Sequence, residues 1–308
     1  MPMFIAPNKT YKSPLKNTIN SWSAQSWPTA THNSYILMVR QLFSLFAASL
    51  LLFSCATTRK AETFVTSTDN AASYKLIFQD NFNVKGGFDT SKWSFSPRGN
   101  VAWNKYLTQQ HNYAFVDGSN LVLRMDNKQI AGDPMPYHSG GIQTKGKFSF
   151  RYGKVEVRAK FNRGRGAWPA IWMMPEKDTF GGWPASGEID IMEHVNTESV
   201  VHQTVHNAAV TNAAGGSTVS KSVAYKLDDY NVYGLVWTND RLVFYVNEVL
   251  THMYHKPTNA SAREWPFDQP FYIILNQSGG AGWPGPITDA DLPFTMQVDW
   301  VSVYTEYE

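Results

Sequence analysis

Residues 154–159 read Lys-Val-Glu-Val-Arg-Ala, and this stretch indicates the fold. Apolar and charged side chains alternate at every second position, as in a β-strand that buries one face and exposes the other. Similar short runs occur at 75–78, 121–124, 242–246 and 298–304, with turn residues between them. We find no long amphipathic helical pattern and no alternation of strands with helices. The sequence therefore predicts an all-β protein, an antiparallel β-sandwich.

The composition limits the classes of partner. The chain has 308 residues, and its formal net charge of +2 gives no strong field that would favour a nucleic acid. Aromatic residues are numerous: 11 Trp, 15 Tyr and 18 Phe. They fit either a large β-rich core or a cleft in which sugar rings stack on aromatic rings. The counts favour the core, and only the positions can separate the two interpretations.

The single cysteine, Cys55, excludes an intramolecular disulfide and closes an apolar segment. A basic start at Arg40 and an apolar run over 42–53 are typical of a secretion signal, and the run is shorter than the about 20 residues that cross a bilayer. Leu-Phe-Ser-Cys at 52–55 resembles the bacterial lipoprotein signal, in which the cysteine is acylated. The alternatives are an ordinary signal peptide or a buried helix with an incidental cysteine.

These features divide the chain into four segments. Residues 1–37 are predicted to precede the true start at Met38, and 38–55 to be the lipoprotein signal peptide. Residues 56–72 are small and polar, as expected of a flexible tether. Residues 73–308 form one β-domain. We therefore expect an exported monomer, anchored by lipid to a bacterial outer membrane on its periplasmic or cell-surface side.

Three acidic residues, Glu188, Asp190 and Glu193, lie within six positions of a strand-like run. Residues two apart share a face of a strand, whereas residues five apart do not. One extra residue, accommodated as a β-bulge at Ile191 or Met192, would bring all three acids onto one surface. The sequence allows this geometry.

Three acids on one face are costly unless they are exposed, paired or used in chemistry. Crowding keeps one carboxyl protonated while another stays ionised. Cleavage of a β-glycoside with retention needs such a pair, about 5–5.5 Å apart. A solvated acidic stripe and a calcium site remain the alternatives on spacing alone.

The run Gly-Glu-Ile-Asp-Ile-Met-Glu-His at 187–194 resembles the active-site signature of glycoside hydrolase family 16, in its bulged, laminarinase-like branch. Further segments resemble neighbouring blocks of that family: 140–148, 152–156, 168–173 and 299–304. The likeness extends from about residue 74 to residue 304.

The resemblance implies that residues 73–308 form a concanavalin-like β-jelly roll with a concave substrate cleft. It implies a retaining, endo-acting hydrolase of a β-linked polysaccharide or glycan that requires no cofactor. In these terms Glu188 is the nucleophile, Glu193 the general acid/base and Asp190 the residue that tunes the pair.

The resemblance also assigns substrate contacts. Trp183 takes the place of a tryptophan that lines the negative subsites. Trp103 and Asn104 resemble a loop that contacts substrate over the cleft. Trp283 lies in a Gly-rich loop that could close on sugar.

Trp168 and Trp172 belong to an apolar block and could line either the cleft or the core. His206 matches a family position beside the acid/base, where it would contact the leaving-group sugar. A zinc site at His202 and His206 is not expected, because a spacing of four on a strand separates their Cα atoms by roughly 13 Å.

Two departures from the family pattern matter. Asp80-Asn81-Phe82 stands where relatives read Asp-Glu-Phe, so a structural calcium ion is expected only weakly, with Asp299 as a ligand. Residues 201–219 differ from the usual glucanase pattern, and His-Gln-Thr-Val-His-Asn at 202–207 resembles endo-β-galactosidases of the same branch.

Three functions follow from these observations. The first is an endo-β-1,3-glucanase of the laminarinase type. The alternative is an endo-β-1,4-galactosidase that acts on host mucin-type O-glycans or poly-N-acetyllactosamine. The third is a non-catalytic, glycan-binding surface lectin, against which the clustered acids argue. The sequence does not identify the sugar, because specificity depends on loop shape and a few hydroxyl contacts.

Overall fold

The computed structural model of the chain describes residues 73–306. The extension, signal peptide and tether expected over 1–72 lie outside these residues, and so does Cys55. Within the described part, no helix is long and apolar enough to cross a membrane.

Sixteen strands and two short 3-10 helices make up the regular structure of the described chain. In chain order they are β1 (Tyr74–Asp80), β2 (Ser94–Phe95), η1 (Ala102–Asn104), β3 (Ala114–Val116), β4 (Leu121–Asp126), β5 (His138–Ser139), β6 (Gly141–Gln143), β7 (Gly153–Phe161), β8 (Ala167–Pro175), β9 (Glu188–Glu193), β10 (Val200–His206), β11 (Ser220–Ala224), β12 (Asn231–Trp237), β13 (Arg241–Val246), β14 (Val249–His255), β15 (Phe271–Gly279), η2 (Asp289–Asp291) and β16 (Phe294–Glu306).

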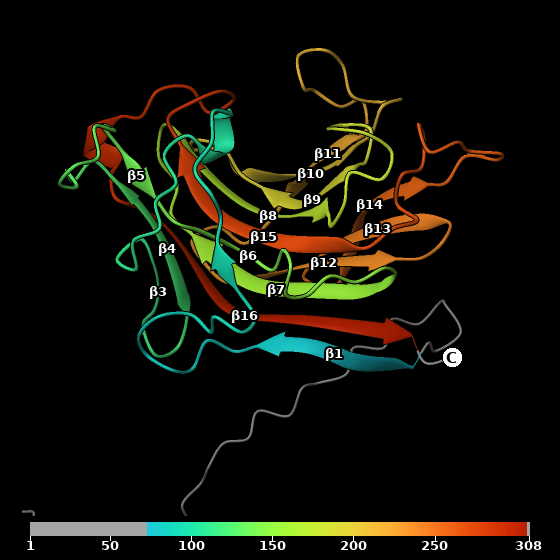
Figure 1. Ribbon diagram of the computed structural model, residues 1–308, viewed down its shortest axis with the longest axis horizontal. Helices are drawn as coiled ribbons and strands as arrows, with labels where there is room; N and C mark the ends of the chain where they lie inside the picture. The colour runs from blue at the N-terminus through green and yellow to red at the C-terminus, as the bar shows by residue number, and fades with distance from the viewer. Residues whose placement is uncertain (1–72, 307–308) are drawn as a thin grey trace, which may run out of the picture. The chain divides into compact units, whose positions relative to one another are not determined.

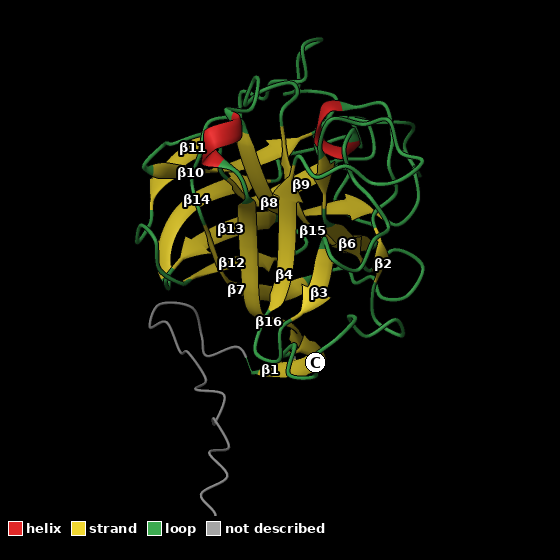
Figure 2. Ribbon diagram, turned by 90° about the vertical axis from the view of Figure 1, so that its left-hand side faces the viewer, coloured by secondary structure: helices red, strands yellow, loops and turns green. Residues whose placement is uncertain are grey.

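The strands form two stacked sheets (Figures 1 and 2). The nine-stranded sheet follows the order β14-β13-β12-β7-β16-β4-β3, with β1 beside β16 and β5 beside β4. The seven-stranded sheet follows the order β11-β10-β9-β8-β15-β6-β2. Every pairing between these strands is antiparallel, which confirms the predicted β-sandwich.

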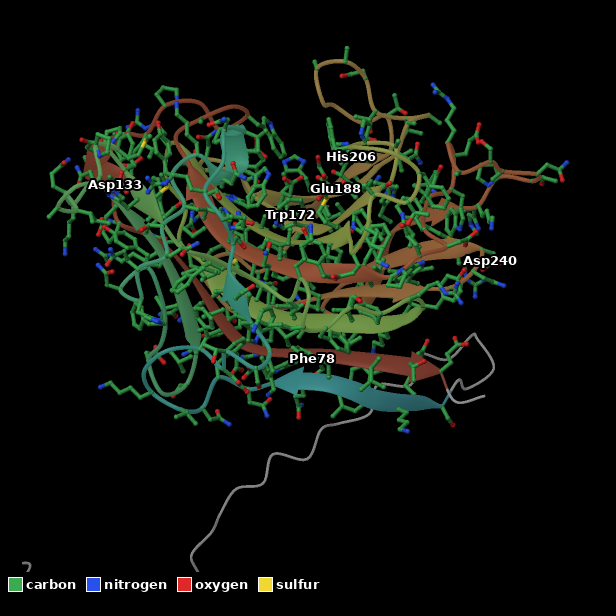
Figure 3. The ribbon with its side chains drawn as sticks, viewed as in Figure 1. Phe78, Asp133, Trp172, Glu188, His206 and Asp240 are labelled. Atoms are coloured by element: carbon green, nitrogen blue, oxygen red, sulfur yellow. The ribbon has the colours of Figure 1, made fainter. Side chains whose placement is uncertain are left out.

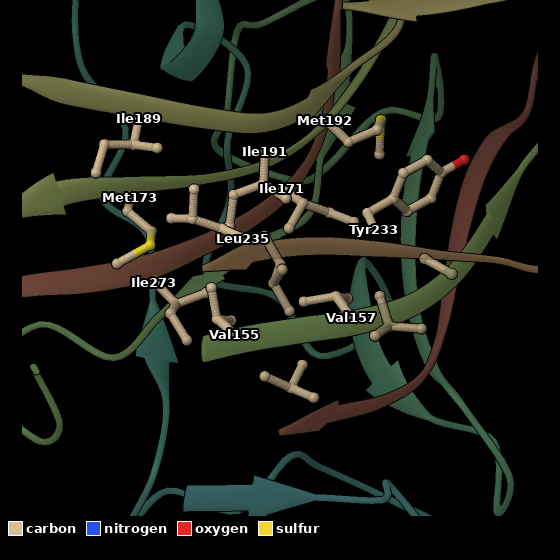
Figure 4. Packing of buried hydrophobic residues seen from close by; sticks show 14 of the residues in the cluster. Val155, Val157, Ile171, Met173, Ile189, Ile191, Met192, Tyr233, Leu235 and Ile273 are labelled. Carbon is tan, nitrogen blue, oxygen red and sulfur yellow. The ribbon is translucent and has the colours of Figure 1, made fainter. Parts of the chain in front are cut away.

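The core lies between the two sheets (Figure 4). Strand β7 contains the alternating stretch that predicted the fold, and its side chains alternate between buried and half-buried along all nine residues. Val155 and Val157 point into the core, where Ile189, Ile191 and Met192 of β9 meet them from the other sheet. Full burial of such a side chain contributes roughly 1.5–3 kcal/mol.

Strand β15 does not alternate, because all nine of its residues are buried. Its outer face is covered, and its polar side chains there have partners. Asn276 accepts a hydrogen bond from Trp172 Nε1 at 2.7 Å and donates one to Ser278 Oγ at 2.9 Å. Ser278 Oγ donates in turn to the main-chain carbonyl of Trp103. This network fixes η1 over the outer face of the seven-stranded sheet.

Candidate active site

A bulge in β9 brings the acids together. On β8, the step from Trp172 to Ile171 is one residue. On β9, the corresponding step from Asp190 to Met192 is two residues. Ile191 is therefore the extra residue, at one of the two positions that the sequence predicted. The bulge turns Ile191 and Met192 both into the core and leaves the acids on the outer face.

Glu188, Asp190 and Glu193 form what we call the acid cluster. Trp183 Nε1 donates a hydrogen bond of 2.6 Å to Glu188 Oε2. His206 Nε2 lies 3.3 Å from Asp190 Oδ2 and 3.9 Å from Glu188 Oε1. Figure 3 shows Glu188 and His206 near each other on the side of the seven-stranded sheet that faces away from the core. Asp190 is only 1% exposed, so it lies at the base of the acid cluster.

Glu193 has different neighbours at the other end of the bulge. Trp168 of β8 donates through Nε1 to Glu193 Oε1 at 2.9 Å. Trp283 meets Trp168 edge to face, with ring centres 6.1 Å apart. Each glutamate thus has its own indole donor, and the Gly-rich loop that carries Trp283 is close to the predicted acid/base.

Burial raises the pKa of all three carboxyl groups. The pKa of Glu188 rises to about 8 and that of Glu193 to about 7, because burial disfavours the charged form and neighbouring acids add repulsion. The pKa of Asp190 is also well above its ordinary value, through burial and then repulsion from Glu193. The indole donors Trp183 and Trp168 act in the opposite direction. The cluster therefore holds a proton near neutral pH.

This arrangement suits acid/base and nucleophilic chemistry at one bond. Two carboxyl groups on the same surface, one ionised and one protonated, can attack an anomeric carbon and protonate its leaving oxygen. The pKa of Glu188, about 8, lies above that of Glu193, about 7, so the pKa order in the free protein does not select Glu188 as the ionised member. The assignment of Glu188 as nucleophile and Glu193 as acid/base rests instead on their places in the family signature.

The same atoms could hold a metal ion. Glu188, Asp190 and His206 offer ligand atoms within 4.8 Å of one another, and they form the one such group of three found among residues 73–306. This group does not include Asp299. The Asp299 carboxylate accepts a hydrogen bond from Arg158 Nη1, on the nine-stranded sheet. Asp299 thus forms an ion pair with Arg158, and the calcium ion expected there stays a prediction.

The other predicted substrate contacts divide into exposed and buried groups. Trp183 is 48% exposed and Trp283 is 49% exposed. Trp172 is 5% exposed, and Trp103 packs against it edge to face at 4.8 Å. Trp172 therefore lies outside the core between the sheets, in a separate cluster beneath η1, and its contact with substrate stays a prediction. Asn104 ends η1, and its amide packs beneath Gly99, where an added Cβ would lie 2.5 Å from Asn104 Nδ2.

The position expected for His206 needs a correction. His206 pairs across the strands with Glu188, whereas Glu193 pairs with His202. His206 therefore lies beside the nucleophile and not beside the acid/base. The register between β9 and β10 decides this, and the bulge shifts that register. Nδ1 of His206 lies 3.1 Å from Thr211 Oγ1, which orients the imidazole ring.

His202 is the residue near the site that sequence reasoning missed. Its ring meets Trp283 edge to face at 4.8 Å, and its Nε2 lies 2.6 Å from Glu198 Oε2. From the sequence, His202 was weighed only as a zinc ligand together with His206, and the spacing of the two residues on a strand argued against zinc. The alternation of β10 could have identified His202 as a site residue, because it places His202 on the same face as His206.

The comparisons with known proteins agree with the site. The profile described as "Glycosyl hydrolases family 16" matches residues 100–302, so the chain belongs to that family. The domain and the acid cluster together define a β-jelly-roll glycoside hydrolase.

Three relatives illustrate the range of the family. The keratan-sulfate endo-1,4-beta-galactosidase of Sphingobacterium multivorum is 56% identical over 279 residues, which cover 85% of this chain and 66% of that protein. The beta-glucanase of Rhodothermus marinus is 34% identical, over 77% of this chain and 87% of its own length. The structure of the Rhodothermus marinus laminarinase superposes with a TM-score of 0.72 and 33% identity, over 78% of this chain and 100% of that chain.

Proposed function

We propose that this protein is a retaining, endo-acting β-galactosidase that cleaves galactosyl glycans of the poly-N-acetyllactosamine type. The observation that carries the catalytic part is the acid cluster, with a separate indole donor on each glutamate. Binding alone does not need one buried and two half-buried carboxyl groups whose pKa is raised. The lectin alternative therefore receives less support than an enzyme.

The galactosyl part rests on similarity. The relative named as a keratan-sulfate endo-1,4-beta-galactosidase is 56% identical, whereas the beta-glucanase is 34% identical. The segment 202–207, which departs from the glucanase pattern, supplies both histidines of β10. The endo-β-1,3-glucanase that the sequence placed first is thus less well supported than its alternative.

The reaction follows from the two glutamates. The Glu188 carboxylate attacks the anomeric carbon of the galactosyl unit and forms a glycosyl ester, while Glu193 gives its proton to the departing oxygen. A water molecule then attacks the same carbon, Glu193 takes its proton, and the Glu188 carboxylate leaves. Because each step inverts the carbon, two steps retain its configuration.

Product analysis tests this proposal. The protein is incubated with keratan sulfate, laminarin and mucin-derived O-glycans, and product lengths are followed from the first minute. We expect internal cleavage of the galactosyl substrates, with a range of long products early, and a β-anomer as the first product by NMR. Turnover of laminarin with none of the galactosyl glycans would reject the galactosidase. Binding without turnover of any of them would support the lectin.

We also infer that the protein is exported and anchored by lipid at Cys55, as a monomer. The support is the Leu-Phe-Ser-Cys run at 52–55 after an apolar segment. Acylation needs the thiol, and a lipid chain contributes about 0.8 kcal/mol per buried CH₂. Cys55→Ser, expressed from Met38, should move the protein from the outer-membrane fraction to the soluble fraction. Unchanged fractionation of this variant would reject acylation at Cys55.

A further inference from the structure

A second concave site lies beyond η1, away from the acid cluster. A cavity of about 400 Å³ is lined by Arg98, Gly99, Asn100, Lys105 and Met135. We call it the Arg98–Lys105 pocket. Its volume is in the range of small-ligand sites, and two of its five lining residues are cationic.

The loop around the pocket is held in place by its own main chain. Gly99 N donates to the Asn104 carbonyl at 3.2 Å, and Asn104 N donates to the Val101 carbonyl at 3.2 Å. Gly99 has no side chain, which lets the Asn104 amide pack directly against it. The two cations are therefore displayed by a loop whose conformation is set before any ligand binds.

The two cations differ in how firmly they are fixed. Arg98 donates through Nε to the Leu107 carbonyl at 2.7 Å, and through Nη1 and Nη2 to Asp133 at 3.0 and 2.6 Å. These bonds use three of the five guanidinium N–H groups, which leaves two for a ligand. Lys105 is exposed, with Nζ 5.2 Å from the centre of the Tyr106 ring. With one carboxylate against two cations, the pocket has a net positive charge.

A series of neighbouring residues connects the acid cluster with the pocket. Trp172 is the strand partner of Asp190, about 4.8 Å away across the sheet. The ring of Trp103 stands on Trp172 at 4.8 Å, and Lys105 follows two residues later in the chain. A sugar chain that lies across β9, β8 and η1 would therefore extend from the acid cluster toward the pocket.

From this placement we propose that the Arg98–Lys105 pocket binds an anionic substituent of the glycan, a sulfate ester or a sugar carboxylate. The inference rests on the proposed function and extends it, since it defines the substrate as a charged galactosyl glycan. Guanidinium and ammonium groups bind such anions through charge-assisted hydrogen bonds. One contact of this kind raises kcat/KM on charged chains and leaves neutral chains unaffected.

The first test compares kcat/KM on keratan sulfate and on the same material after chemical desulfation. Lys105→Ala should lower kcat/KM about tenfold on the sulfated chain, equivalent to 1.4 kcal/mol, and leave the desulfated chain unchanged. Lys75→Ala is the matched control, because Lys75 is an exposed lysine on β1 of the other sheet. Equal losses on both substrates, or no loss on either, would overturn the proposal.

A second test does not depend on turnover. The Glu188→Gln variant is titrated by calorimetry with a sulfated lactosamine oligosaccharide, its sialylated counterpart and the neutral parent. We expect tighter binding of one charged ligand than of the neutral one, and loss of that difference in Glu188→Gln/Lys105→Ala. The charged ligand that binds more tightly shows whether the pocket prefers a sulfate ester or a sugar carboxylate. Equal binding of all three would reject the pocket, and turnover of laminarin alone would reject the galactosidase independently.

Discussion

Strands β7 and β9 both carry several charged residues on their outer faces, yet the charges on the two strands have opposite surroundings. On β7, Lys154 Nζ lies 2.7 Å from Glu156 Oε1, and Arg158 forms an ion pair with Asp299 of β16. Every charge named here has an opposite partner. On β9 three acids of the same sign lie together, with a histidine as the nearest basic group.

The two charge arrangements fit two different roles of the outer faces. The ion pairs on β7 are half-buried at the outer face of the nine-stranded sheet, and each contributes on the order of 1 kcal/mol or less. The buried and half-buried acids on β9 destabilise the fold, because their ionisation is opposed by burial and repulsion. Clusters of acids with raised pKa that lower stability in this way are typical of active sites, where the carboxyl groups perform chemistry.

The comparison is tested most strongly by removing one acid from each strand. Glu188→Gln and Glu193→Gln should each lower kcat by about 10³-fold or more, because each removes one half of a two-carboxylate mechanism. Glu156→Gln on β7 should leave kcat unchanged. Initial rates on keratan sulfate and thermal unfolding are measured for all three variants. Near-normal rates in either β9 variant would refute the assignment of the acids.

A smaller loss is expected for the indole that donates to the nucleophile. Trp183→Ala should lower kcat/KM by ~10–100-fold, since a hydrogen bond to a charged group and a stacking surface contribute about 1.4–2.8 kcal/mol. Trp183 is 48% exposed, so Tm should change little. The loss should be larger on long chains than on short aryl glycosides. A fall in Tm with unchanged rates would mean instead that Trp183 serves the fold.

The dependence of stability on pH should also separate β9 from β7. The pKa of Glu188 in the folded protein is about 8, against an ordinary value of 4.5, so the native state binds more protons between these values. The contribution of Glu188 to the free energy of unfolding should therefore fall as pH rises from about 4.5 to about 8, by at least about 1 kcal/mol.

Glu188→Gln removes this proton and should flatten the decline, so that the variant gains stability over the wild type at pH 8 but not at pH 4. Glu156→Gln should follow the wild-type curve. Calorimetric scans from pH 4 to pH 8.5 measure both. A Tm difference between Glu188→Gln and the wild type that stays constant across this interval would contradict the raised pKa of Glu188.

The smallest effect is expected on β7 itself. Lys154→Met breaks the pair with Glu156 and should change the free energy of unfolding by less than about 1 kcal/mol, with no effect on activity. Urea unfolding at low and at high salt measures the change. A loss of several kcal/mol would show that ion pairs on this face stabilise the fold more than their exposure implies.

Much of this site could be predicted because its signal is local. Alternation within a strand follows from the two-residue period of the backbone, so 154–159 predicted one buried face. The five-residue spacing from Glu188 to Glu193 required one extra residue for a common face, and Ile191 is that residue. Both features depend only on residues close together in the sequence, so they can be predicted without knowledge of the rest of the chain.

Contacts between strands could not be predicted in the same way. His206 meets Glu188, and His202 meets Glu193, only because β9 and β10 pair in a register that the bulge shifts. Trp172 is buried only because η1, from far earlier in the chain, packs on it. The register and the order of the strands depend on burying the apolar faces of all strands at the same time.

By itself the sequence determined the β-sandwich and the strand that carries the acids, because period and spacing act within a few residues. The tertiary structure alone decided which aromatic rings and histidines accompany each acid, and it brought Met135 to the pocket that Arg98 and Lys105 line. The physical reason is that a side chain's environment is set by neighbours distant in sequence, whose positions follow from packing of the whole domain.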